Sequence, residues 1–127
     1  IREGAVALSV AHDSHNIIVV GVSDEEMEFA VNSLIAQEGG IVLVKEGKVI
    51  ESMPMPIAGL MSDQSGEWVD QKLTDIHEKA YSELGISGEV EPVMTLCFMS
   101  LAVIPEVKLT DMGLFDVTTF SFISTEA

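Results

Sequence analysis

Large and small apolar side chains alternate between Ala5 and Ala11, with Val6 and Leu8 on the face opposite the alanines. A period of two predicts a β-strand, and the small-residue face predicts close approach by a neighbouring element. A second apolar run, from Ile17 to Gly21, is β-branched until its glycine. This composition is typical of a central strand covered on both faces.

Five consecutive polar residues, His12, Asp13, Ser14, His15 and Asn16, connect these two runs. Because the connection is short, an antiparallel hairpin is the economical prediction. A bend or bulge in one long strand is the alternative.

The next segment has the pattern of an amphipathic helix that runs to about Glu38. Ser23 and Glu26 have the spacing of a capping box, and apolar residues then recur at helical spacing. Gly39 and Gly40 predict the end of the helix, since glycine readily takes the left-handed conformation found there.

A hairpin and a loop are predicted after this helix. Ile41 to Lys45 and Lys48 to Met53 flank Glu46-Gly47, and Pro54 and Pro56 then end the pairing because proline cannot donate to a ladder. The apolar segment Ile57 to Met61 contains glycine and follows two prolines, which indicates a buried or docking loop.

A second helix is expected to begin with Ser62 or Asp63 as its cap and to end at Gly85. Its apolar positions form a narrow stripe: Val69, Leu73, Ile76, Ala80 and Leu84. His77 lies beside this stripe, and we expect a boundary residue with a solvent or backbone partner.

The last part of the chain is predicted to contain mainly strands. Val93 to Leu101 is apolar throughout and indicates a buried strand, Pro105 interrupts the pattern, and Val107 to Leu114 contains the Asp and Gly of a turn. Phe115 to Ile123 alternates again and predicts one closing strand. The whole pattern predicts a single α+β domain, in which a mixed or largely antiparallel sheet packs with two main helices.

Composition narrows the possible partners. Lys and Arg total 6 against 21 Asp and Glu among 127 residues, which gives a net charge of -15 and predicts no binding to nucleic acid or to an anionic membrane surface. No apolar run approaches the roughly 20 residues of a membrane span. The single cysteine, Cys97, lies in an apolar run, so we expect a reduced, buried thiol and a cytoplasmic protein.

The residue types of the polar connection leave three interpretations open. His12 and His15 are three residues apart and are suited to bind one metal ion, with Asp13 as a further ligand or as a partner that orients a ring. The same side chains are suited to proton transfer or to binding a polar ligand. In the third interpretation, Asp13, Ser14 and Asn16 bond to local backbone groups and simply make a turn.

Three long motifs, in order, carry a resemblance to a known family. They are Val10 to Gly21 (VAHDSHNIIVVG), Pro56 to Asp63 (PIAGLMSD) and Met94 to Val117. Together they resemble the C-terminal domain of bacterial and archaeal adenine deaminase, over essentially the entire chain. Cys97 departs from the family, in which serine is more often expected, and this departure argues against a catalytic cysteine.

The resemblance implies that residues 1–127 are one domain of a longer enzyme of the amidohydrolase superfamily, which hydrolyses adenine to hypoxanthine and ammonia in purine salvage. It implies a preceding (β/α)8 barrel that holds Mn or Fe, the ion that activates water in such barrels. None of the metal-binding motifs of the barrel occurs here. We therefore expect no metal ligands in this chain, and no deamination by the chain alone.

The resemblance also suggests what the domain does. We expect it to pack on the barrel of the same chain, where His12, Asp13 and His15 serve as auxiliary catalytic residues. Ser14 and Asn16 are then expected to bind the substrate, adenine, and to fix the loop. The alternative is a noncatalytic scaffold or oligomer-interface domain that uses Ile57 to Met61, and a homo-oligomer is expected in either case.

Overall fold

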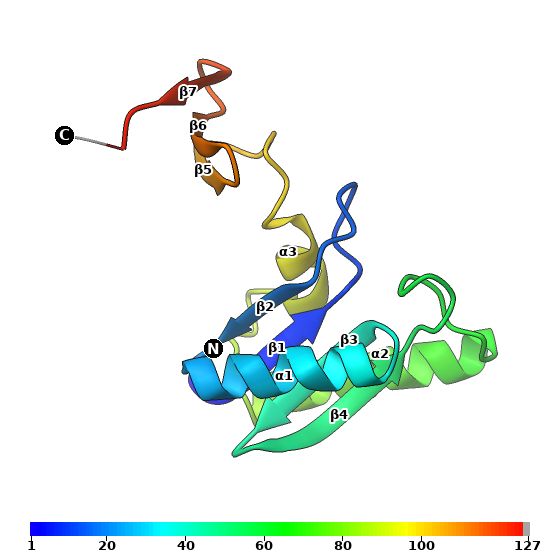
Figure 1. The fold of residues 1–127 in the computed structure, drawn as a ribbon. Helices are drawn as coiled ribbons and strands as arrows, with labels where there is room; N and C mark the ends of the chain where they lie inside the picture. Colours follow the sequence, from blue (N-terminus) through cyan, green and yellow to red (C-terminus); the bar gives the residue numbers. More distant parts are fainter. Residues whose placement is uncertain (126–127) are drawn as a thin grey trace.

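In the computed structural model, which describes residues 1–125, an antiparallel sheet lies between helices on both of its faces (Figure 1). The sheet has the order β2-β1-β3-β4, with the bounds β1 Ala5–Leu8, β2 Ile18–Gly21, β3 Gly40–Lys45 and β4 Lys48–Pro54. Helix α1 (Asp24–Ala36) covers one face, and helices α2 (Gly66–Ser82) and α3 (Pro92–Phe98) lie on the other. Together these elements form the main body of the domain.

A second sheet projects from the end of α3, away from the main body (Figure 1). It contains β5 (Val107–Thr110), β6 (Gly113–Asp116) and β7 (Ser121–Ile123), all antiparallel and in that order. We call this sheet the arm. The expected α+β class and the antiparallel pairing are confirmed, with one helix and one sheet more than the pattern predicted.

The alternation in β1 separates two hydrophobic clusters. Ala5 and Ala7 pack with Ala30 and Leu34 of α1, so their small side chains do allow a helix to approach closely, as predicted. The opposite face of the sheet packs against α2 and α3 through a larger set of buried residues: Val6, Leu8, Ile41, Leu43, Met53, Ile76, Ala80, Leu84, Val93 and Leu96. Apolar burial on both faces is the dominant stabilising contribution to such a sheet.

The two predicted hairpins of this sheet are confirmed. β1 pairs antiparallel with β2, from Ala5 opposite Gly21 to Leu8 opposite Ile18, and β3 pairs with β4 across the turn at Glu46-Gly47. The prediction of a central position for β2 is wrong, since β2 is an edge strand and β1 is an inner one. A β-branched run reports strand propensity, whereas the order of strands depends on pairings with distant residues.

The helix caps match the sequence at α1 and differ at α2. Ser23 caps α1 by accepting a hydrogen bond from the Glu26 amide, as predicted. Ser65, rather than Ser62 or Asp63, caps α2 by accepting from the Trp68 amide at 3.3 Å. The hydroxyl of Ser62 accepts instead from the amide of Gln64, two residues later, and so belongs to a turn before the helix.

The predicted strand from Val93 to Leu101 is wrong, because residues 92–98 form helix α3. Glu91 caps this helix and Pro92 occupies its first turn, which is the position where proline is best tolerated. Val93, Leu96 and Cys97 are buried at helical spacing, while Met94 is exposed. An apolar run of this length is compatible with either element until its neighbours are known.

The predicted single strand from Phe115 to Ile123 is also wrong, since it is split into β6 and β7 by a turn. One carboxylate oxygen of Asp116 accepts hydrogen bonds from the Thr118 amide and hydroxyl and from the Thr119 amide. Such a short polar side chain favours a turn over a continuous ladder. The Phe115 ring then contacts both Phe120 and Phe122 edge to face.

The segment from Ile57 to Met61 forms a turn that lies against Ser9. The Ser9 hydroxyl donates to the Gly59 carbonyl at 2.5 Å, and Ile57 and Met61 remain 46% and 58% exposed. The segment is therefore not buried, and a docking role for it stays a prediction. Within residues 1–125, no helix is long and apolar enough to cross a membrane.

Candidate functional site

The five polar residues from His12 to Asn16 form an exposed loop between β1 and β2. The backbone makes the turn itself: the Ser14 amide donates to the His12 carbonyl at 2.8 Å, and the His15 amide donates to the Ala11 carbonyl at 2.9 Å. Asp13 and His15 have positive φ angles of 69° and 50°. The segment is therefore a turn made by backbone hydrogen bonds, whereas the expected bonds from the Asp13, Ser14 and Asn16 side chains to local backbone groups do not form within residues 1–125.

The C-terminal end of α3 anchors the loop at three points. The His12 amide donates to the Cys97 carbonyl at 2.9 Å, and the His12 ring lies 5.0 Å from the Phe98 ring between centroids. The Ser14 and Ser100 hydroxyls are hydrogen-bonded at 3.3 Å. A loop fixed at one edge by a helix end is held in position better than a free hairpin tip.

No sequence pattern indicated the roles of Phe98 and Ser100. Both lie in the segment that was predicted to be a strand, and a strand offers no helix end against which a loop can rest. The contacts join residues 86 positions apart in the case of Ser14 and Ser100. Long-range pairs of this kind are decided by how the elements pack.

Three side chains of the loop are free to act on a ligand. In the part of the chain that the structure describes, the side chains of Asp13, His15 and Asn16 make no hydrogen bond or ion pair, and all three residues are exposed. A carboxylate, an imidazole and an amide together can accept a proton, donate one and bind a polar ring edge.

A surface pocket of about 580 Å³ adjoins the loop on the side of the arm. Asn16 and Ser100 line it with the Thr110-Asp111 turn of the arm and with two apolar residues, Ala102 and Leu109. The pocket therefore brings together the loop, the end of α3 and the arm. Its mixed lining suits a ligand with both polar and apolar edges.

A metal site is not assembled by these residues. Among residues 1–125, no group of three or more His, Cys, Asp or Glu side chains is arranged to hold an ion. His12 and His15 thus lack the further ligands that a closed site requires. Cys97 is a buried free thiol on α3, in agreement with the structural role expected for it.

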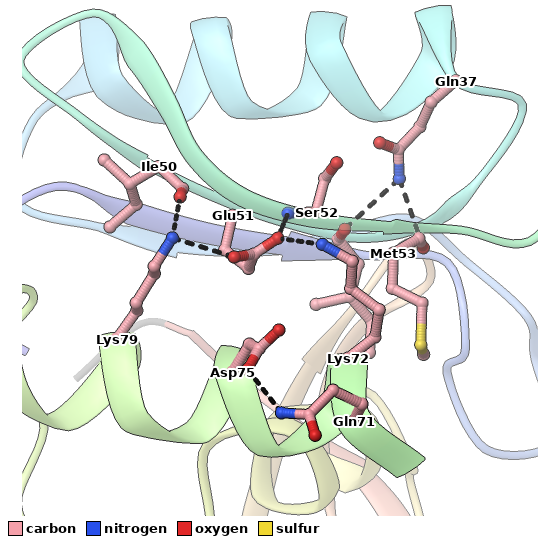
Figure 2. Close-up of polar contacts among 10 residues, drawn as sticks. Gln37, Ile50, Glu51, Ser52, Met53, Gln71, Lys72, Asp75 and Lys79 are labelled. Atoms are coloured by element: carbon pink, nitrogen blue, oxygen red, sulfur yellow. Dashed lines mark hydrogen bonds and ion pairs between the residues drawn. The ribbon is translucent and has the colours of Figure 1, made fainter. Parts of the chain in front are cut away.

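The main concentration of charged contacts lies elsewhere, between β4 and α2 (Figure 2). The Glu51 carboxylate accepts from Lys72 at 2.7 Å and from Lys79 at 2.8 Å, and Lys79 also donates to the Ile50 carbonyl. Burial raises the pKa of the Glu51 carboxyl, but the hydrogen bonds from Lys72 and Lys79 outweigh it and lower the pKa to about 2.

This charged cluster has a structural explanation, because it fastens α2 to the sheet and satisfies a carboxylate that is only 12% exposed. A second pair joins the helices: His77 of α2 contacts the carboxylate of Glu91, which also caps α3. The expectation of a solvent or backbone partner for His77 is therefore wrong. The sequence pattern gave no indication of either partnership.

Comparison with known proteins identifies the family. The model of the adenine deaminase C-terminal domain matches residues 1–121. The chain belongs to the adenine deaminase C-terminal domain family. This finding confirms the resemblance carried by the three sequence motifs.

Similar curated proteins agree with the family. Adenine deaminase 2 of Desulfotalea psychrophila is 75% identical over 127 residues, which is 100% of this chain and 22% of that protein. Adenine deaminase of Bacillus subtilis is 49% identical over 123 residues, which is 97% of this chain and 21% of that protein. Adenine deaminase of Nitratidesulfovibrio vulgaris is 52% identical over 122 residues, again 21% of its length. The adenine deaminase C-terminal domain is thus a minor part of these relatives.

Proposed function

We propose that this domain serves a full-length enzyme that hydrolyses adenine to hypoxanthine and ammonia, and that the His12–Asn16 loop completes an active site built mainly by a preceding catalytic domain. The proposal is supported by the identity with adenine deaminases along the whole chain. The observation that carries the role of the loop is its arrangement. The loop is anchored on α3, yet the side chains of Asp13, His15 and Asn16 make no hydrogen bond or ion pair within residues 1–125.

The loop residues divide into acting and supporting groups in this proposal. His15 and Asp13 transfer protons to or from the substrate or the attacking water, which requires exposed groups that are not held by internal partners. Asn16 contacts the purine, because its amide both donates and accepts as the edge of adenine does. Ser14 and the ring of His12 hold the loop on Ser100 and Phe98, with the His12 nitrogens available as an auxiliary acid or base.

The metal of the reaction, Mn or Fe, belongs to the preceding domain in this proposal. The described residues offer no ligand set for it, so no step through a metal is assigned to this chain. We further propose that the full-length protein is a cytoplasmic homo-oligomer of purine salvage. Light scattering on the full-length protein measures its assembly directly.

Replacing His15 by asparagine in the full-length enzyme tests the role of the loop. Asparagine tolerates the positive φ of 50° at this position, so the backbone of the loop is retained while the imidazole is lost. We expect kcat/KM for adenine to fall by about 10²-fold, the usual scale for a general acid or base.

The matched control is His77→Asn, because His77 lies in α2 and pairs with Glu91 rather than with the loop. It should leave kcat/KM near the wild-type value. Wild-type kinetics of His15→Asn with normal metal content, accompanied only by a change in stability, would show that the loop is a structural turn.

A further inference from the structure

The arm exposes far more apolar surface than a small sheet normally leaves to solvent. Leu109, Met112 and Phe120 are 80%, 76% and 72% exposed, and Phe122 is 53% exposed. Figure 1 shows the arm projecting beyond α3, and within residues 1–125 it has no extensive packing against α1, α2 or the four-stranded sheet. Strands of three or four residues are at the short end of the usual range, and a small sheet of this kind gains stability when its apolar face packs on another element.

An apolar groove lies on the main body between the chain start, β2 and α3. Its volume is about 240 Å³, and its lining includes Ile1, Val20, Val90, Leu96 and Met99. Ile1 and Val20 are 39% and 38% exposed. Val20 belongs to β2, which is an edge strand of the four-stranded sheet. The groove is therefore an uncovered extension of the hydrophobic core.

Exposed apolar side chains occur at the groove, in the connection that follows α3 and in the arm. Met99 lines the groove and is 54% exposed, and Val103, in the connection from α3 to the arm, is 58% exposed. Leu109 of the arm then lines the pocket beside the His12–Asn16 loop. Exposed apolar side chains gathered on one part of a protein mark a contact site.

We propose that this surface, from the groove at Ile1 along α3 to the arm, is where the preceding polypeptide of the full-length protein packs. More than three quarters of the length of the 75% identical relative lies outside the matched domain. The matching family is a C-terminal domain, so that polypeptide precedes it, and the side chain of Ile1, four residues before β1, lines the groove. The preceding polypeptide is thus covalently linked to the domain, which raises its effective concentration at the groove.

This inference takes the occupant from the proposed full-length enzyme but does not depend on its reaction. Docking presents the loop and the arm to the same partner, since Asn16 and Leu109 share a pocket. The test below reads side-chain protection. Wild-type kinetics of the His15→Asn variant with intact protection would overturn the role of the loop alone, and a loss of activity in that variant without protection would overturn the docking surface alone.

Methionine oxidation in the full-length protein tests the proposal, with each site quantified by mass spectrometry. Met99, which lines the groove, and Met112 of the arm lie on the proposed surface and are 54% and 76% exposed here. Met61, 58% exposed on the turn beside Ser9, lies off the surface and serves as the matched control. The same protein unfolded in urea gives the rate of a fully exposed methionine.

We expect Met99 and Met112 to oxidise about tenfold more slowly than Met61 in the folded full-length protein, as expected for side chains excluded from water. Rates equal to that of Met61 would overturn the proposal. Protection that disappears on dilution to the monomer would also overturn it, because a second copy would then be the occupant.

Two variants, one on the proposed surface and one off it, test whether the arm itself is part of the docking surface. Leu109→Ala removes an exposed apolar side chain from the arm, and Ile57→Ala, at 46% exposure, does so off the surface. Leu109→Ala should raise the oxidation rate of Met112 several-fold in the full-length protein, while Ile57→Ala leaves it unchanged. An unchanged Met112 rate in Leu109→Ala, or an equal increase in both variants, would contradict docking through the arm.

Discussion

The two sheets of this domain are built from the same antiparallel pairing but have opposite surroundings. In the four-stranded sheet, Leu43 and Val42 point to opposite faces and both are fully buried, because helices cover each side. In the arm, Leu109 is 80% exposed and Phe120 72%. Backbone hydrogen bonds alone contribute little net stability. The four-stranded sheet is therefore stabilised mainly by burial of its apolar side chains, whereas the arm buries few of its own.

The position of the polar loop follows from this contrast. The His12–Asn16 loop leaves the rigid sheet at the end of β1, rests on the end of α3, and shares a pocket with the arm. A scaffold that is packed on both faces fixes the base of the loop, while the exposed side of the molecule is left for a partner. Three predictions test how far the two regions differ.

The largest effect is expected from Leu43→Ala in the four-stranded sheet. Leu43 is 0% exposed, and loss of its side chain should lower the free energy of unfolding by about 2–5 kcal/mol. Leu109→Ala in the arm should change it by no more than about 0.5 kcal/mol in the 127-residue chain. Urea unfolding of both variants measures the contrast, and similar losses would show that the arm shares the main hydrophobic core.

A smaller effect is expected from Glu51→Gln, which weakens the polar link between β4 and α2. At neutral pH the variant should be less stable by about 1–3 kcal/mol, because Lys72 and Lys79 lose a charged acceptor. Folding lowers the pKa of Glu51 from 4.5 to about 2, so its contribution is present above pH 4.5 and is lost as the pH falls towards 2.

The stability difference between wild type and Glu51→Gln should therefore narrow over that acidic range, as measured by urea unfolding at a series of pH values. The exposed carboxylate of Glu78, on the same helix as the two lysines, provides the control substitution Glu78→Gln. A difference that stays constant down to pH 2 would contradict the assigned role of the two lysines.

The smallest effect is expected from Asp116→Ala in the arm. Hydrogen bonds from Thr118 and Thr119 lower the pKa of the Asp116 carboxyl and fix the turn between β6 and β7. Its loss should speed amide hydrogen exchange in the arm by roughly two- to tenfold and leave β1 and β3 unchanged, because a weakly packed region opens locally. Mass spectrometry resolves the two regions, and faster exchange throughout would show that they unfold together.

Part of the candidate site was predictable from the sequence, because its polar residues are consecutive and interrupt two apolar runs. His12, Asp13, Ser14, His15 and Asn16 lie together in one exposed loop, as expected. The anchors Phe98 and Ser100 were not predictable, since Val93 to Leu101 was expected to form a strand and residues 92–98 form helix α3 instead. An apolar run without clear periodicity does not distinguish a buried strand from a short helix.

The sequence by itself determined the local elements of this protein and its family. The capping box at Ser23, the hairpin turn at Gly47 and the alternation in β1 act over a few residues, and three long motifs identify an adenine deaminase C-terminal domain. Only the tertiary structure decided that β2 lies at an edge, that Glu51 joins two lysines, and that the arm stands apart. Those features depend on contacts between residues distant in sequence, which local propensity does not specify.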